Sequence, residues 1–172
     1  GFNNIASKEK WIEVHGFEHW TEFYTDYGIN LQKKFFGYYL KGEQNGWNNH
    51  SKVSIQVRYP NDKFVLRNEN EWPLKNTCWT KFYLSSMDLK LEKVSKEINS
   101  KLSYNNLGDG ITFVTEPFFE DTEITGPAAS KLFISSETED TDLFLILRLF
   151  NEQQEEVTFQ GALDPKTPLA QG

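Results

Sequence analysis

The sequence predicts a mainly-β protein, in which a β-sandwich of the jelly-roll type follows a short α/β segment. Three observations lead to this prediction. Short strand-like runs alternate with turn signals through residues 53–172. Residues 1–42 instead combine one strand, a histidine-bearing loop and one helix. A polar stretch rich in Asn and Gly, residues 43–52, separates the two regions as a linker.

Composition narrows the classes of protein to consider. The chain has 172 residues, of which 15% are aromatic, and this content is too high for a disordered tail. Its net charge of −7 argues against nucleic-acid binding, and no apolar run approaches the 18 residues of a membrane span. Cys78 is the only cysteine, so no intramolecular disulfide can form. No leader is visible, and we favour a cytoplasmic location, although the absence of an initial Met leaves room for an upstream start.

The α/β segment begins with a short apolar strand at residues 10–14. A helix is expected to begin at Thr21 or Asp26 and to end at Leu40, with Gly42 as its C-cap. One apolar face is predicted from a four-residue spacing of Leu31, Phe35 and Tyr39.

The β region opens with the alternating run Val53–Tyr59, which ends in a Pro-Asn-Asp turn. Further strands are predicted at residues 64–66, 78–84, 89–91, 111–114, 132–134, 143–150 and 157–163. Many short strands at this spacing are typical of a β-sandwich. Residues 104–172 hold 3 Lys/Arg against 13 Asp/Glu, which we interpret as an acidic, solvated outer face.

The segment His15-Gly16-Phe17-Glu18-His19 is the densest cluster of catalytic residue types. One interpretation is a zinc peptidase, because the segment matches the inverted zincin motif H-x-x-E-H. Glu92 or Glu97 would supply a third ligand. That chemistry needs both imidazoles on one face of a helix, and Gly16 weakens a helix here.

A second interpretation is the histidine of a Ser-His-acid triad, which lies on a loop between a late strand and a helix. Such an imidazole takes the proton of the serine and returns it to the leaving group. A third interpretation is a purely structural histidine pair beside Trp20.

The segments KWIEVHGFEHW, QKKFFGYYLKG and NEWPLKNTCWTKFYL lie at residues 10–20, 32–42 and 70–84. Together with later segments they resemble the CocE/NonD hydrolases, the family of cocaine esterase and the bacterial X-Pro dipeptidyl-peptidases. The first two segments are similar to the end of the family's α/β-hydrolase domain. NEWPLKNTCWTKFYL is similar to the start of its galactose-binding-like jelly roll. The segments that resemble the rest of the jelly roll are residues 111–126, 131–150 and 163–172.

The resemblance implies an α/β-hydrolase end at residues 1–42, a linker at 43–52 and a jelly roll at 53–172, truncated at its C-terminus. It also implies that His19 is the catalytic histidine of a serine esterase or X-Pro dipeptidyl-peptidase, and it gives His15 no role. The sequence contains no G-x-S-x-G, and only Glu9, Glu13 and Glu18 are acids that precede His19. We therefore expect an excerpt that is inactive alone.

The expected partners are an ester or X-Pro peptide substrate and the remainder of the hydrolase domain, with self-association as a further possibility. No cofactor or metal is expected. The competing class is a non-catalytic carbohydrate-binding module, in which Trp47, Trp72 and Trp79 would stack on sugars. Aromatic residues of this kind are more often part of a core or an interface.

Overall fold

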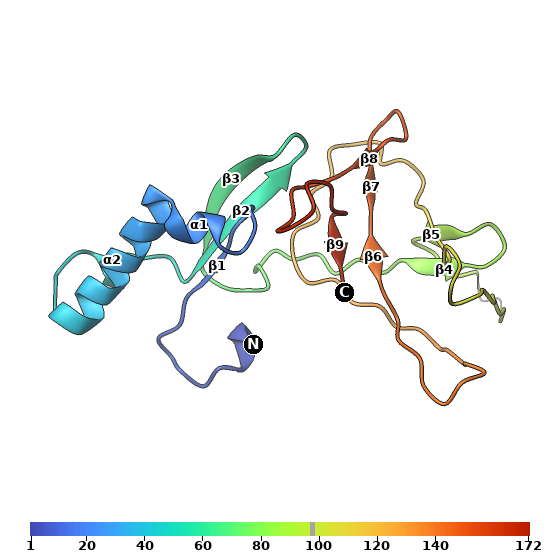
Figure 1. The fold of residues 1–172 in the computed structure, drawn as a ribbon, viewed down its shortest axis with the longest axis horizontal. Helices are drawn as coiled ribbons and strands as arrows, with labels where there is room; N and C mark the ends of the chain where they lie inside the picture. The colour runs from blue at the N-terminus through green and yellow to red at the C-terminus, as the bar shows by residue number, and fades with distance from the viewer. Residues whose placement is uncertain (97–98) are drawn as a thin grey trace. The chain divides into compact units, whose positions relative to one another are not determined.

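The computed structural model describes residues 1–96 and 99–172 and divides them into two compact units. The first unit comprises residues 1–75 and 125–172, and the second comprises residues 76–124. Figure 1 shows the order of the elements along the chain. None of the described helices is both long enough and apolar enough to cross a membrane.

A three-stranded sheet organises the N-terminal part of the first unit, in the order β1 (Ile12–Val14), β2 (Val53–Tyr59), β3 (Lys63–Glu69). β1 and β2 are parallel, with Val14 opposite Ile55, and β2 and β3 form an antiparallel hairpin. The start of β2 is buried on both faces, from Val53 to Ile55, as expected for the central strand of a sheet. Burial then decreases steadily to the exposed Arg58 and Tyr59, so the apolar/polar alternation of the sequence is not reproduced as alternating burial.

Two helices form the crossover between β1 and β2, namely α1 (Thr21–Tyr24) and α2 (Asp26–Lys41). Thr25 separates them because its extended ψ of 161° cannot continue a helix. Gly42 ends α2 with φ 68°, a left-handed conformation that costs glycine little, as the sequence predicts. The helix prediction is thus confirmed over its length, with one break that the apolar spacing does not reveal.

Aromatic side chains pack between α2, β1 and the segment that leads to β2. Rings of Trp11, Phe35 and Trp47 lie with their centroids 5.0–6.3 Å apart, and Trp47 is buried. Trp47 belongs to the short 3-10 helix η2 (Trp47–Asn49), inside the predicted linker at residues 43–52. A second 3-10 helix, η1 (Phe2–Asn4), begins the chain. The predicted domain boundaries remain predictions, and the sheet joins β1 to β2 from the two sides of that linker.

The rest of the first unit contains short strand pairs between longer irregular segments. β6 (Ile146–Leu147) pairs with β9 (Ala170–Gln171), and β7 (Leu149–Phe150) pairs with β8 (Glu156–Val157). Arg58 of β2 reaches this part of the chain. Its guanidinium donates a 2.7 Å hydrogen bond to the carbonyl of Leu169 and lies 4.6 Å from the ring centre of the buried Phe159.

The second unit contains the hairpin of β4 (Tyr83–Ser85) and β5 (Lys90–Glu92). Val114 extends it by a parallel bridge to Lys90, with backbone hydrogen bonds of 2.9 and 3.0 Å. Of the strand predicted at residues 111–114, only this bridge forms.

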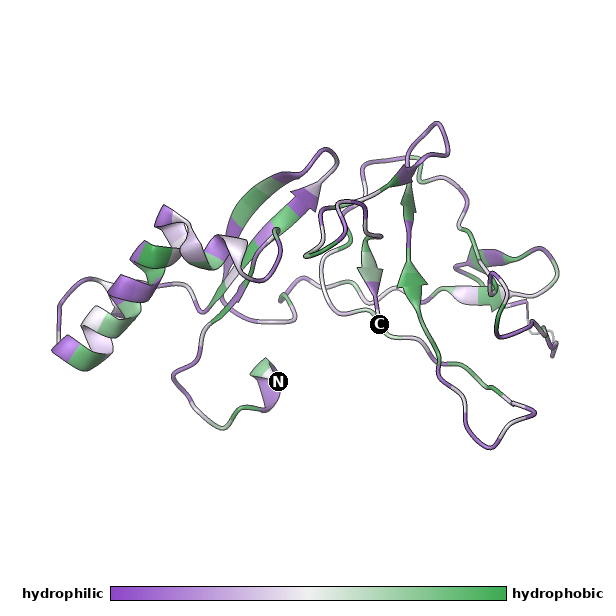
Figure 2. Ribbon diagram, in the orientation of Figure 1, coloured by the Kyte–Doolittle hydropathy of each residue, from purple (hydrophilic) through white to green (hydrophobic). Residues whose placement is uncertain are grey.

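The mainly-β class is confirmed, although most strands are shorter than the sequence predicts. Residues 132–134 form no strand, and residues 143–150 hold two strands of two residues each. A strand extends only where a neighbouring backbone accepts and donates its hydrogen bonds. The apolar residues of these segments are green in Figure 2, and several of them, such as Phe133 and Phe144, remain exposed.

Candidate functional site

The candidate site lies on the loop between β1 and α1, at the carboxyl end of β1. His19 occupies this loop two residues before α1, and its side chain is exposed. Its ring packs edge-on against Trp20, with 4.5 Å between centroids. In open α/β sheets, the carboxyl ends of parallel strands are where reactive groups meet their ligands. The position of His19 after a strand and before a helix therefore agrees with the layout predicted for a triad histidine.

The β2–β3 hairpin holds the beginning of this loop. The backbone N–H of Gly16 donates a 3.1 Å hydrogen bond to Oε1 of Gln56 in β2. A Cβ at position 16 would lie 2.0 Å from the ring of Phe64 in β3, so only glycine fits here without displacing that ring. Phe17 also packs on Phe64, with 4.8 Å between ring centroids.

The same glutamine reaches the helix that follows the loop. Nε2 of Gln56 donates a 3.0 Å hydrogen bond to Oε1 of Glu22, a carboxylate in α1 that is only 8% exposed. Gln56 thus bridges the loop before His19 and the helix after it. Sequence reasoning did not identify Gln56, Glu22 or Phe64. The alternation of Val53–Tyr59 places Gln56 on one face of its strand, but does not show what that face meets.

Glu18 is held by the first residue of α1. The hydroxyl of Thr21 donates to Oε1 of Glu18, and this hydrogen bond is the main reason why the pKa of Glu18 lies below its usual value. The neighbouring imidazole of His19 lowers the pKa of Glu18 further. Glu18 is therefore a carboxylate that anchors the end of the loop.

The other acids that precede His19 are engaged elsewhere. Oε2 of Glu13 accepts a 2.9 Å hydrogen bond from the hydroxyl of Tyr27, and burial raises the pKa of Glu13. Glu9 forms an exposed ion pair with Lys52, with 3.1 Å between the charged atoms. Both carboxylates are therefore engaged by partners other than His19.

The geometry of a helical zinc motif is not formed by His15 and His19. Residues 15–19 form a loop, and α1 begins only at Thr21. Among residues 1–96 and 99–172, no three His, Cys, Asp or Glu side chains gather as a metal site. Of the proposed third ligands, Glu92 pairs with Lys96 at 2.9 Å, and Glu97 lies outside the described residues.

The three tryptophans considered for sugar binding differ in exposure. Trp47 is 3% exposed and belongs to the aromatic cluster with Trp11 and Phe35, so it contributes to the core. Trp72 is half-buried, and Trp79 is 65% exposed. Only Trp79 therefore presents most of its surface for stacking.

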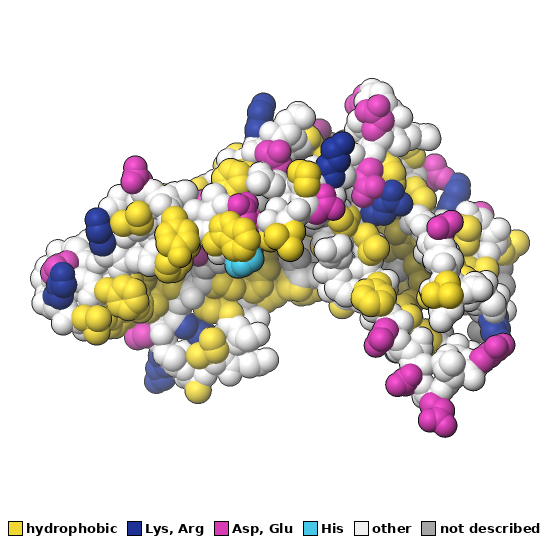
Figure 3. Space-filling view, viewed as in Figure 1, with side chains coloured by type: hydrophobic (Ala, Val, Ile, Leu, Met, Phe, Trp, Pro, Cys, Tyr) yellow, Lys and Arg dark blue, Asp and Glu magenta, His cyan; other side chains and the backbone are white. Residues whose placement is uncertain are grey.

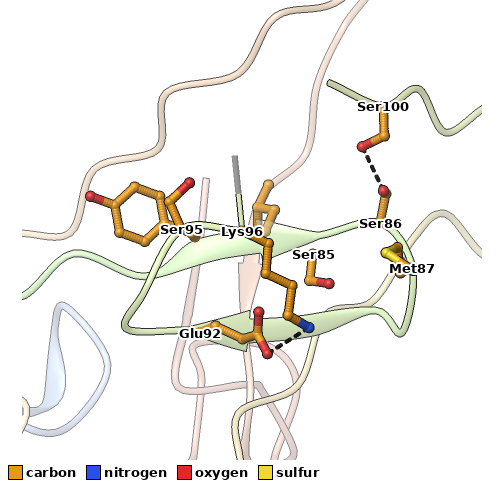
Figure 4. A pocket seen from close by; sticks show the side chains of 9 residues that line it. Ser85, Ser86, Met87, Glu92, Ser95, Lys96 and Ser100 are labelled. Carbon is orange, nitrogen blue, oxygen red and sulfur yellow. Dashed lines mark hydrogen bonds and ion pairs between the residues drawn. The ribbon is translucent and has the colours of Figure 1, made fainter. Parts of the chain in front are cut away.

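A small cavity of about 120 Å³ lies in the second unit beside β4 and β5. Figure 4 shows the serine side chains that line it together with Lys96 and Glu92. Hydrogen bonds to Glu92 and Asp88 raise the pKa of Lys96, so this ammonium group stays protonated.

A larger groove of about 860 Å³ lies in the first unit, along one side of α2. Most of its lining is apolar, and its aromatic side chains are Trp11, Phe23, Phe35, Phe36, Tyr39 and Trp47. Figure 3 shows hydrophobic side chains at the surface in the region of α2. Phe36 and Tyr39 are 50% and 43% exposed, so part of the predicted apolar face of this helix is uncovered.

Comparison with known proteins identifies a family and finds similar solved structures. Residues 45–172 match the family model described as the X-Pro dipeptidyl-peptidase C-terminal non-catalytic domain. No curated protein matches the sequence. Two crystal structures of a CocE/NonD family hydrolase from Staphylococcus aureus are similar to this chain, each with 35% identity and a TM-score of 0.51. Each match covers 55% of this chain and 17% of the hydrolase chain, so the chain matches a small part of that protein's length.

Proposed function

The chain belongs to the family of X-Pro dipeptidyl-peptidase C-terminal non-catalytic domains, and from this membership we propose that it is part of a serine hydrolase whose general base is His19. The similarity to a CocE/NonD family hydrolase supports the hydrolase class. Since that similarity covers 17% of the hydrolase chain, the activity of the whole protein is part of the proposal.

The observation that carries the proposal is the position of His19. An exposed imidazole lies at the carboxyl end of a strand with a parallel neighbour, immediately before the crossover helices. In this position His19 would accept the hydroxyl proton of a serine as that oxygen attacks the substrate carbonyl. It would then deliver the proton to the leaving alcohol or amine, and water would release the acyl group in the reverse sense.

The nucleophile and the acid would come from parts of the enzyme outside this sequence, which contains no G-x-S-x-G. The substrate would be an ester or a peptide with proline in the second position.

The test is His19→Ala in the full-length enzyme, assayed with p-nitrophenyl acetate and with Ala-Pro-p-nitroanilide. Loss of a triad histidine is expected to lower kcat by about 10⁴-fold or more. His15→Asn is the matched control, because His15 shares the loop but has no role in the proposal. Activity of His19→Ala within tenfold of the parent enzyme would overturn the proposal.

The same pair of variants distinguishes the triad hydrolase from a zinc peptidase, the alternative that the motif H-x-x-E-H suggests. A zinc enzyme would lose activity with either substitution and would contain stoichiometric metal. The triad enzyme loses activity only with His19→Ala, and chelators leave it active. Metal analysis of the purified protein completes this comparison.

A further inference from the structure

A single side chain connects the loop that carries His19 to the helix that follows it. Gln56 accepts a 3.1 Å hydrogen bond from the N–H of Gly16 through Oε1 and donates a 3.0 Å hydrogen bond to Glu22 through Nε2. Gly16 lies three residues before His19, and Glu22 lies three residues after it. Both polar ends of the amide are therefore used, one on each side of the histidine.

We infer that Gln56 is a positioning residue, which sets the place of His19 by holding both ends of its loop against β2. The inference rests on the proposed function of His19. It also extends that function, because Gln56 and Phe64 lie within residues 45–172, the part that matches a domain described as non-catalytic. The β2–β3 hairpin would thus shape the catalytic loop from outside the hydrolase segment predicted at residues 1–42.

Burial makes the hydrogen bonds of Gln56 costly to break. Gly16 is buried, Glu22 is 8% exposed, and both hydrogen bonds are partly buried. A partly buried amide or carboxylate that loses its partner is left poorly solvated. Breaking the hydrogen bonds between Gln56 and the loop or α1 therefore costs free energy. The ring of Phe64, pressed against Gly16 and Phe17, limits movement of the loop in the same place.

The chemistry of the bridge offers a sharp test, because its two side chains can be exchanged. In Glu22→Gln/Gln56→Glu, the carboxylate at position 56 accepts from the N–H of Gly16 with one oxygen. Its other oxygen accepts from the amide at position 22. Both hydrogen bonds and one negative charge are kept. In Gln56→Glu alone, two carboxylates face each other and repel.

The experiment measures kcat and KM in the full-length enzyme, with kcat expressed per active site counted from the burst of p-nitrophenol. Gln56→Leu and Gln56→Glu are expected to lower kcat by about 10- to 100-fold, because a displacement near 1 Å has that effect on a catalytic group. KM is expected to change by less than about twofold, since Gln56 does not touch the substrate in this proposal. The exchanged double variant is expected to recover kcat to within about threefold of the parent.

Gln44→Leu is the matched control, because it makes the same chemical change at an exposed position. Active-site titration and the thermal midpoint separate loss of folded enzyme from loss of turnover. If Gln56→Leu fails to fold, the comparison of Gln56→Glu with the double variant decides the question.

Three outcomes would overturn the inference. A kcat for Gln56→Leu within twofold of Gln44→Leu contradicts a positioning role, and so does a double variant no more active than Gln56→Glu. An active His19→Ala enzyme removes the proposed function and the inference with it. If His19→Ala is inactive while the Gln56 variants are normal, the inference alone is wrong.

Discussion

Two glutamates close to the histidine loop differ in what their surroundings do to their charge. The pKa of Glu18 is lowered, chiefly because the hydroxyl of Thr21 donates to its carboxylate. The pKa of Glu13 is raised, chiefly because burial disfavours its charged form, although the hydrogen bond from Tyr27 opposes the shift. At the scale of residues, the charged form of Glu18 is therefore favoured at the end of the loop, whereas the charged form of Glu13 is disfavoured in the strand before it.

The raised pKa of Glu13 predicts a pH-dependent effect on stability. Below its ordinary value of 4.5 the group is protonated in the folded and the unfolded chain, and it costs nothing. As the pH rises from 4.5 through the higher folded pKa, the carboxyl ionises more readily in the unfolded chain than in the folded one. The folded state is therefore progressively destabilised over this range. Nearby Glu22 adds to this cost and His15 reduces it. Glu13→Gln keeps an acceptor for Tyr27 and removes the charge.

We therefore expect Glu13→Gln to raise the thermal midpoint at pH 7, and we expect the gain to vanish below about pH 4.5. Thermal unfolding followed from pH 4 to pH 8 measures this difference. Glu120→Gln, at an exposed position, is the control for removal of one charge. A gain that is the same at every pH would contradict the role assigned to burial.

At the scale of elements, the two crossover helices depend on the residue between them. The hydroxyl of Thr25 accepts a 3.1 Å hydrogen bond from the N–H of Gly28 and donates a 2.8 Å hydrogen bond to the carbonyl of Glu22. The first contact caps α2, and the second satisfies a carbonyl of α1. Thr25 thus ends one helix and begins the next.

Thr25→Ala is expected to destabilise the start of α2 by about 1 kcal/mol, a usual cost for loss of an N-cap side chain. Thr25→Ser keeps the hydroxyl and is expected to retain most of that stability. Amide hydrogen exchange at Gly28 and its neighbours measures the effect locally. Equal protection in the Ala and Ser variants would show that the cap contributes little.

A second link between elements joins β2 to the last residues of the chain. Arg58 donates to the carbonyl of Leu169 and covers the ring of Phe159, whose backbone is paired with Thr167 in both directions at 2.8 Å. Burial lowers the pKa of Arg58, but its guanidinium stays charged because the ordinary value is far above neutral.

Arg58→Met is expected to lower the protection of the Phe159 and Thr167 amides by about 1–3 kcal/mol, since it removes a charged hydrogen bond and a cation–π contact. Hydrogen exchange of those amides is the measurement. The exposed Arg148, which pairs with Glu156 at 2.6 Å, offers Arg148→Met as a control. Unchanged exchange in Arg58→Met would show that the C-terminal segment is held by other contacts.

At the scale of the whole molecule, many large apolar side chains of the described residues remain exposed. Large side chains such as Phe119 and Phe133 are 99% and 93% exposed. Exposed apolar area of this extent is typical of surfaces that another part of a protein covers.

We expect the chain produced alone to bind a hydrophobic dye such as ANS and to self-associate, and we expect neither effect for these residues within the complete enzyme. Dye fluorescence and light scattering measure the two properties. A monomer that binds no dye would contradict this expectation and would indicate that the chain buries its apolar residues by itself.

Local signals predicted the N-terminal elements well, because each depends on a few neighbouring residues. The end of α2 at Gly42 and the strand Val53–Tyr59 follow from such signals and are confirmed. The loop position of His19 after a strand and before a helix is also as predicted. Its catalytic role stays a prediction, since that role depends on groups that this chain does not contain.

The sequence by itself determined the mainly-β class and the loop rich in catalytic residue types, because composition and periodicity are local properties. Tertiary structure decided which segments meet, because pairing depends on partners distant in sequence. It placed β2 parallel to β1, brought Gln56 to Gly16 and Glu22, and left residues 132–134 without a strand partner. The bridge around His19 was thus not predictable, since a polar residue in an alternating strand gives no sign of the loop that it meets.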